Sequence, residues 1–226
     1  MKFKELKSQV SSKLNGYKVF FSPAEVPVEI LFPEQWSDFG LLKNVSPKLP
    51  KAWSVFSDRL PWVCDWLQKC VVGTVLVVGK KTYLGYVYLE DEEVYIYLGG
   101  APLKNISAAD KAKIPSLLVD FYVNLHDGFG FYIGMSMGPS PVEDFLLVQE
   151  LCEEELDFLP PLISFFSSGA GDYLAMAVVS GREVGYVWWH ENPRNPEENI
   201  DVWAVMNTWM AIFLENCDSN ERVFLE

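Results

Sequence analysis

The stretch that decides the fold is residues 72–98, VGTVLVVGKKTYLGYVYLEDEEVYIYL, which is rich in β-branched and aromatic residues with a period of two. It predicts three strands, over residues 72–79, 83–89 and 93–98. Only the acidic tip at 90–92 separates the last two strands, so they are predicted to form an antiparallel hairpin.

Upstream of this stretch, two helices enclose an irregular region. Apolar residues at helical spacing predict a short amphipathic helix at the beginning of the chain, which Gly16 ends. Pro61 begins a second helix that runs to about residue 70, with Ser57 and Asp58 as candidate caps. The frequent prolines between residues 22 and 61 predict irregular structure with short elements.

Downstream, helical and extended patterns alternate. Apolar spacing predicts a helix over 114–125, with Gly128 just past its end, and a final helix over 202–213 that Asp201 or Asn199 caps. Further strands are predicted over residues 129–137, 144–149, 173–179 and 184–189. Because these elements lack regular βαβ alternation, they predict an α+β fold, with a largely antiparallel sheet flanked by helices.

The net charge of −13 arises entirely in the second half of the chain. Residues 1–113 contain 15 Lys and Arg against 12 Asp and Glu, whereas residues 114–226 contain 3 Arg against 19 Asp and Glu. Such a distribution repels nucleic acid and anionic membranes and attracts basic proteins. No apolar run approaches the roughly 18 residues that a membrane span requires. The predicted partner is therefore a basic protein, with neither nucleic acid nor membrane.

The cysteines and the N-terminus indicate a cytoplasmic protein. Four cysteines are too few for disulfide bonds to stabilise the fold of a chain of 226 residues, and none forms a C-x-x-C pair. The first 16 residues alternate charged and apolar side chains and lack the apolar core of a secretion signal. We therefore expect reduced thiols and a cytoplasmic location.

Candidate catalytic residues are few, because the chain has only two histidines. His126 and His190 have no H-x-x-x-H spacing that would place two imidazoles on one helical face, so no metal and no other cofactor is predicted. The sequence has no G-x-S-x-G motif, and Ser167 and Ser168 precede a glycine as in a turn. We predict a non-enzymatic protein. A metal-dependent hydrolase that uses Asp172, His190 and Glu191 is the less favoured alternative.

Aromatic residues interleave with the carboxylates of the second half. The periodic positions of Tyr173 and Trp203 favour a core location for both. Trp188 and Trp189 are adjacent on a predicted strand, so one of them faces away from the other and is a candidate surface or second-core residue.

Four segments resemble the SUKH superfamily: IPSLLVDFYVNLHDG (114–128), PPLISFFSSGAGDYLAMAV (160–178), GREVGYVWWHE (181–191) and DVWAVMNTWMAIF (201–213). In order, these segments match the superfamily in a helix that ends at a glycine, a glycine turn with Asp before a strand, a strand that ends in Trp and His, and a closing helix. The positions that match this pattern are predicted to be mainly structural: Gly169, Gly171, Asp172, Trp188, His190 and Trp203.

The resemblance implies an α+β domain and a function. It divides the chain into an N-terminal extension of helices and a β-hairpin (1–110), either part of the same sheet or a small second unit, and a SUKH-like domain (111–226). The superfamily consists largely of bacterial immunity proteins that neutralise toxins, many of them nucleases, and it includes a fungal cell-wall assembly regulator family.

We therefore predict a cytoplasmic immunity protein that occludes a cognate basic toxin through an acidic face. A regulatory scaffold that binds a cellular protein is the second interpretation. The predicted partner-binding residues lie in loops flanking the aromatic segments: Glu153, Glu154, Asp157, Glu191, Glu197 and Glu198.

Overall fold

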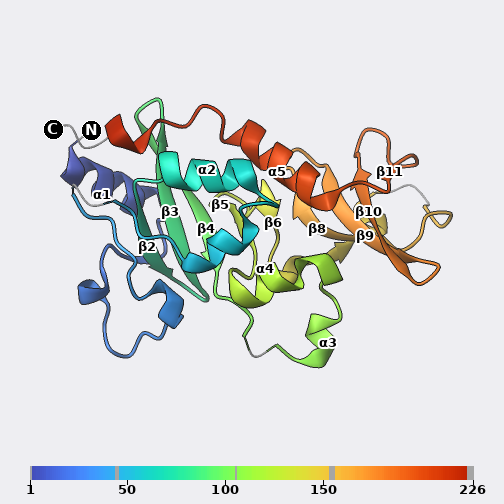
Figure 1. The fold of residues 1–226 in the computed structure, drawn as a ribbon, viewed down its shortest axis with the longest axis horizontal. Helices are drawn as coiled ribbons and strands as arrows, with labels where there is room; N and C mark the ends of the chain where they lie inside the picture. Colours follow the sequence, from blue (N-terminus) through green and yellow to red (C-terminus); the bar gives the residue numbers. More distant parts are fainter. Residues whose placement is uncertain (1, 44–45, 105, 153–155, 223–226) are drawn as a thin grey trace.

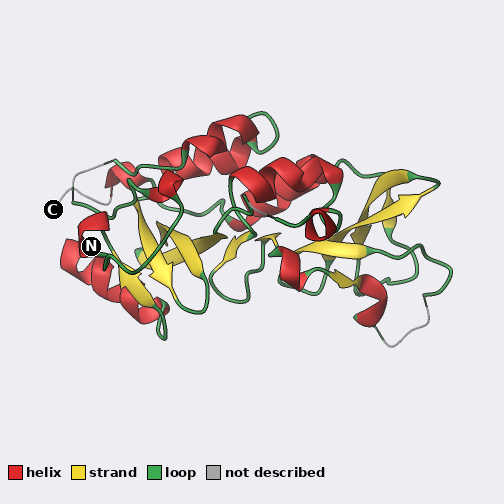
Figure 2. Ribbon diagram, turned by 90° about the horizontal axis from the view of Figure 1, so that it is seen from below, coloured by secondary structure: helices red, strands yellow, loops and turns green. Residues whose placement is uncertain are grey.

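Two antiparallel β-sheets lie end to end in the computed structural model, and helices cover them. The molecule is elongated, with the first sheet at the end that holds both chain termini (Figure 1). Figure 2 shows the strands of the two sheets following one another along its length. The structure describes residues 2–43, 46–104, 106–152 and 156–222.

The first sheet has the order β1-β2-β3-β4-β5. Its strands are β1 (Lys18–Phe20), β2 (Gly73–Val78), β3 (Thr82–Glu90), β4 (Glu93–Gly100) and β5 (Phe129–Phe131). Glu90 pairs with Glu93 at the tip of the β3–β4 hairpin, and the two intervening residues, Asp91 and Glu92, both have positive φ. Two left-handed residues give a turn whose twist matches that of the strands, so the predicted hairpin is confirmed.

The second sheet has the order β11-β10-β9-β8-β6, and β7 also pairs with β8. Its strands are β6 (Gly138–Pro139), β7 (Leu146–Leu147), β8 (Ile163–Ser167), β9 (Tyr173–Val179), β10 (Arg182–Trp188) and β11 (Glu197–Glu198). β9 and β10 form a hairpin through Ser180 and Gly181, at φ of 51° and 77°. The prediction of an α+β fold with antiparallel pairing is confirmed, with two sheets where one was expected.

Two strand predictions need correction, and one strand was not predicted. The strand predicted over 129–137 ends at residue 131, because Gly134, Met135 and Met137 all have positive φ and turn the chain. The strand predicted over 144–149 is reduced to two residues. β8 was not predicted at all, since its apolar run has no alternation that distinguishes a strand from other buried segments.

Four predicted helices are confirmed, with shorter bounds in one case: α1 (Phe3–Lys13), α2 (Pro61–Lys69), α4 (Val119–Asn124) and α5 (Val202–Phe213). The short helix α3 (Ala108–Lys111) was not predicted. Short 3₁₀ turns accompany them: η1 (Pro23–Glu25), η2 (Glu34–Trp36), η3 (Lys51–Phe56), η4 (Ser116–Leu118), η5 (Val142–Asp144), η6 (Val148–Glu150) and η7 (Asn220–Arg222). The helix predicted over 114–125 consists of η4 followed by α4. Between α1 and α2 the described chain forms only β1 and 3₁₀ turns, as the prolines predict.

Helices cover both faces of the first sheet. On one face, Val10 of α1 is fully buried in a cluster with Val75 and Val77 of β2. On the other face, the ring of Trp66 in α2 lies 5.2 Å from that of Tyr88 in β3. Burial of these side chains contributes about 2 kcal/mol each, so the helices stabilise both faces of this sheet.

α5 connects the two sheets. Its Trp209 contacts Phe166 of the second sheet at 5.7 Å between ring centroids, and its Phe213 contacts Phe131 of the first sheet at 5.1 Å. Asn207 Oδ1 accepts hydrogen bonds from the Trp62 and Val63 N–H groups, at 3.1 and 3.4 Å. These groups would otherwise be unsatisfied at the beginning of α2.

One predicted helix cap is confirmed and the other is not. Asp201 accepts a hydrogen bond from the Ala204 N–H at 3.1 Å, which confirms it as the cap of α5. No side chain caps α2 from its own N-cap position, Leu60, so the predicted caps Ser57 and Asp58 are replaced by the distant Asn207.

A single hydrophobic cluster contains residues of both sheets and of α2, α4 and α5. The predicted division at residue 110 falls within α3, whereas the chain passes from the first sheet to the second between Phe131 and Gly138. The segment before residue 110 therefore shares its sheet with β5, which follows α4.

Candidate functional site

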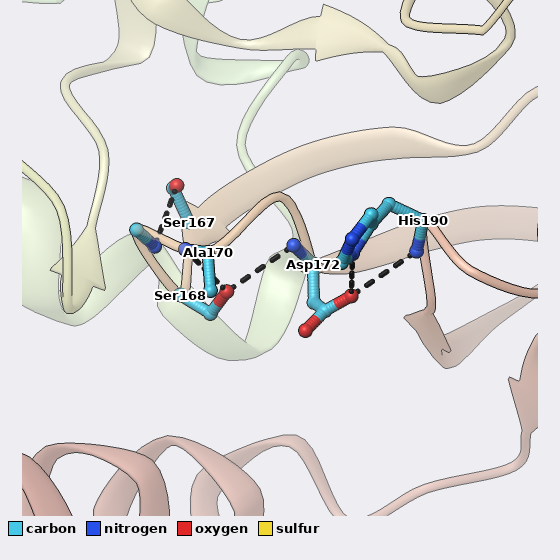
Figure 3. Close-up of polar contacts among 6 residues, drawn as sticks. Ser167, Ser168, Ala170, Asp172 and His190 are labelled. Atoms are coloured by element: carbon cyan, nitrogen blue, oxygen red, sulfur yellow. Dashed lines mark hydrogen bonds and ion pairs between the residues drawn. The ribbon is translucent and has the colours of Figure 1, made fainter.

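The glycine turn between β8 and β9 is held by its own backbone and hydroxyl groups. Ser168 N–H donates to the Asp172 carbonyl at 2.9 Å, and Ser168 Oγ accepts from the Ala170 and Asp172 N–H groups at 3.1 and 3.2 Å. Gly169 and Gly171 have φ of 77° and 99°, a region that favours glycine. Figure 3 shows this turn beside His190.

Asp172 ties the turn to the end of β10. Its Oδ1 accepts from the His190 N–H at 3.1 Å and lies 2.8 Å from His190 Nδ1 (Figure 3). A Cβ atom on Gly171 would lie 3.1 Å from the His190 ring, so glycine allows the imidazole to approach this turn closely. The four predicted family-pattern residues Gly169, Gly171, Asp172 and His190 are thus brought together as one structural unit.

This unit has an acid–imidazole pair without a nucleophile in contact. The Asp172–His190 pair leaves His190 Nε2 unused by any described residue, and the side chain is 47% exposed. Ser168 Oγ receives amide donors, and no hydrogen bond between a serine hydroxyl and His190 is found among the described residues. Glu191 is exposed. Within the described residues, no three His, Cys, Asp or Glu side chains are grouped as metal ligands would be.

The two adjacent tryptophans point to opposite faces of the second sheet. Trp188 is buried, and its Nε1–H donates to the Pro193 carbonyl at 3.2 Å. Trp189 is half-buried, its ring lies 5.8 Å from Trp209 of α5, and its Nε1–H donates to Glu197 at 3.1 Å. Trp189 is therefore the partly exposed member of the pair, at the margin of the core.

The other two aromatic positions contact the core. Tyr173 packs against Trp188 with a ring distance of 6.1 Å. Trp203 contacts Phe56 at 5.8 Å, and the Arg59 guanidinium lies 5.3 Å from its ring. Both are half-buried, so neither supplies a fully exposed aromatic surface.

Four predicted partner-binding residues lie at the outer end of the second sheet, and all four are exposed: Asp157, Glu191, Glu197 and Glu198. Glu153 and Glu154 lie outside the described residues. The loop after β10 meets the segment after residue 156 through Arg194, whose guanidinium is 4.9 Å from the Phe158 ring. We call Asp157, Glu191, Glu197 and Glu198 the acidic edge.

The acidic edge extends over two faces. Glu197 pairs with Val187 and Glu198 with Tyr186, so successive side chains of β11 point in opposite directions. Glu197 accepts from Trp189 on the α5 face, whereas Glu198 lies on the face of Tyr186, whose pKa it raises after the larger effect of burial. The sequence alone does not show which of the two glutamates points to which face, because that depends on the register between β10 and β11.

His126, the other histidine of the chain, is fully buried in the core. Its Nδ1 lies 3.0 Å from the Gly100 carbonyl, which can only accept, so Nδ1 carries the proton. Its Nε2 then accepts from the Tyr86 hydroxyl at 2.7 Å, and Tyr86 accepts from Trp53 Nε1–H at 2.9 Å. Burial lowers the pKa of His126 to about 4, which keeps the ring neutral.

A second interaction that the sequence did not predict joins η4 to β10. Glu183 accepts from the Ser116 N–H and hydroxyl, the latter at 2.6 Å. The two residues are 67 positions apart. No local signal identifies such a pair, because a carboxylate near the beginning of a strand is usually solvated.

No protein-family model, curated protein or solved structure matches this chain. No helix in the described ranges combines the length and the apolar character that crossing a bilayer requires.

Proposed function

We propose that this chain is a non-enzymatic protein-binding module that captures a basic protein partner through its acidic edge. The observation that carries the proposal is the exposure of all four described carboxylates of the edge at one end of the second sheet. Among the described residues, none of Asp157, Glu191, Glu197 and Glu198 forms an ion pair with a Lys or Arg. Their charge is therefore available to a partner.

The charge would act mainly on the rate of capture. Exposed carboxylates with few neighbouring cations attract a basic protein over distances of about 10 Å at physiological salt. Short-range contact would come from apolar area beside the edge, where Trp189 is half-buried and Phe158 is 56% exposed. Such contacts determine how slowly the complex dissociates.

The partner we propose is a toxin, as the resemblance to the SUKH superfamily implies. Many toxins of that kind are nucleases, and a nuclease groove that normally meets phosphates carries basic residues. Carboxylates of the edge would take the place of phosphates and occlude the groove stoichiometrically. We place the protein in the cytoplasm, where its four cysteines would remain thiols.

Co-expression with a candidate toxin encoded beside the gene, followed by co-purification, tests this proposal. We expect a complex that a triple reversal in the acidic edge, Glu191→Lys, Glu197→Lys and Glu198→Lys, weakens by at least about tenfold. Wild-type affinity in this edge variant would contradict the proposal.

A matched control changes the same number of charges elsewhere. Glu29, Glu34 and Asp58 are exposed in the first half of the chain, so replacing them with Lys shifts the net charge equally. We expect this control variant to bind like the wild type. Equal weakening in both variants would show that net charge, and not the edge, attracts the partner.

A further inference from the structure

An apolar groove of 580 Å³ opens on the second sheet, at the end of the β9–β10 hairpin. Its floor consists of Ile163 on β8 and of Met176 and Val178 on β9. The segment after α3 supplies one wall through Ile114, and the turn after η5 supplies another through Phe145. The volume matches that of sites which accept a small molecule or a few side chains of a peptide.

The groove is kept open by a tether. Glu183 of β10 accepts from the Ser116 N–H and hydroxyl, so the chain that follows Ile114 is attached to the sheet beside the floor instead of lying across it. Val178 remains 67% exposed, an unusual state for a valine on the same sheet face as the core. Covering this apolar surface would be favourable by about 25 cal/mol for each Å².

The rim of the groove has an excess of negative charge. Glu143 and Glu183 line it together with Lys113, and Lys81 binds Glu143 at 2.8 Å. Asp144 adjoins Glu143, and its pKa is raised by burial and then by that neighbouring carboxylate. Lys81 also contacts Asp127, at 3.9 Å. The groove and its surroundings therefore hold four carboxylates against two ammonium groups.

The groove and part of the acidic edge lie on the same face of the sheet. Val178 pairs with Glu183, and Val187, four residues along β10, pairs with Glu197. Paired residues and residues separated by an even number of positions share a face in a sheet. Between them on this face, Val187 is buried and Gly185 packs against Ile200 and Val202, so Glu197 and the groove are two separate exposed places on one face of the sheet.

The geometry points to a docking site for one class of segment: an apolar side chain of the partner protein, flanked by Lys or Arg. The apolar side chain fills the space between Val178, Met176 and Phe145, and the flanking cation meets Glu143 or Glu183. This inference deepens the proposed function, because it specifies which part of a basic partner enters which part of the sheet.

Two synthetic peptides with the same apolar part test the site without the partner. We titrate acetyl-Lys-Leu-Leu-Lys-amide and acetyl-Glu-Leu-Leu-Glu-amide into the full chain and follow the methyl signals of Ile163, Met176 and Val178 by NMR. We expect the cationic peptide to shift these signals with a Kd on the order of 1 mM and the anionic peptide to bind at least about fivefold more weakly.

Neighbouring valines provide a matched pair of variants. Val178→Asn removes apolar floor, whereas Val179→Asn changes the next residue, which is 38% exposed on the opposite face. We expect Val178→Asn to weaken the cationic peptide about fivefold and Val179→Asn to leave it unchanged. If Val178→Asn unfolds at the assay temperature, the isosteric Val178→Thr replaces it.

Three results would overturn the inference: no methyl shifts with 10 mM (roughly ten times the expected Kd) cationic peptide, equal binding of both peptides, or equal effects of the two valine variants. None of these results depends on the acidic edge. If the peptide titration fails, co-purification of the edge variant remains an independent test of the proposed function. If the co-purification fails, the peptide result is unaffected.

Discussion

The two sheets of this protein differ in how completely they are covered and in what they leave exposed. The first has α1 on one face and α2 on the other, and its central strands are almost entirely buried. The second carries its core contacts beneath α5 but ends in an exposed acidic strand, β11, and an open groove. The first sheet is therefore the more completely buried of the two, while the second leaves exposed the surface that we propose binds a partner.

The two histidines provide the strongest test of this contrast. We expect His126→Leu to lower the free energy of unfolding by about 3 kcal/mol, because it leaves Tyr86 and the Gly100 carbonyl without their buried partner. His190→Leu is the control on the second sheet, and we expect it to cost less than about 1 kcal/mol, since its ring is exposed. Urea denaturation measures both, and equal losses would break the contrast.

The pH dependence of stability sharpens the same point. The pKa of His126 is lowered from 6.5 to about 4 in the folded state, so the unfolded chain binds the extra proton between these values. Stability from the neutral ring is complete above pH 6.5 and is lost as the pH falls toward 4, by about 3 kcal/mol in total.

The same acid titration in His126→Leu isolates this contribution from that of the carboxylates. We expect the wild type to lose about 3 kcal/mol more than the variant between pH 7 and pH 4, as measured by urea midpoints. Parallel curves for the two proteins would show that His126 is not held neutral by its surroundings.

Asn207 joins α5, which contacts both sheets, to the beginning of α2. We expect Asn207→Ala to lower the free energy of unfolding by about 1 to 2 kcal/mol, because the N–H groups of Trp62 and Val63 lose their acceptor. Asn216→Ala, at an exposed position beyond α5, is the control and should change it by less than about 0.5 kcal/mol. Thermal unfolding is followed by tryptophan fluorescence and by far-UV circular dichroism. Transitions that do not coincide would reveal a loss of stability that affects only one sheet.

Features with local causes were predictable from the sequence, and features that depend on distant contacts were not. The β3–β4 hairpin and the Asp201 cap follow from residues within a few positions of one another. Asn207 caps a helix 145 residues away, and β8 has an apolar run without alternation, so neither leaves a local signal. His126 is buried through a core that only the whole chain assembles.

The candidate site was predicted to a similar extent. Asp172 and His190 form the hydrogen bonds of a structural unit, and Glu197 and Glu198 are exposed, whereas the part of these two glutamates in binding a partner stays a prediction. The face that each glutamate takes depends on the β10–β11 register, which the sequence does not specify. The groove is built from segments far apart in the chain, so no single motif predicts it.

The most direct test of the acidic edge is the association rate with the inactivated toxin, measured by stopped flow at about 20 mM and about 500 mM salt. We predict that the wild type associates at least about tenfold faster at low salt and that the edge variant, Glu191→Lys, Glu197→Lys and Glu198→Lys, loses this advantage. A wild-type rate that is independent of salt, or an edge variant that keeps the full salt dependence, would contradict the account.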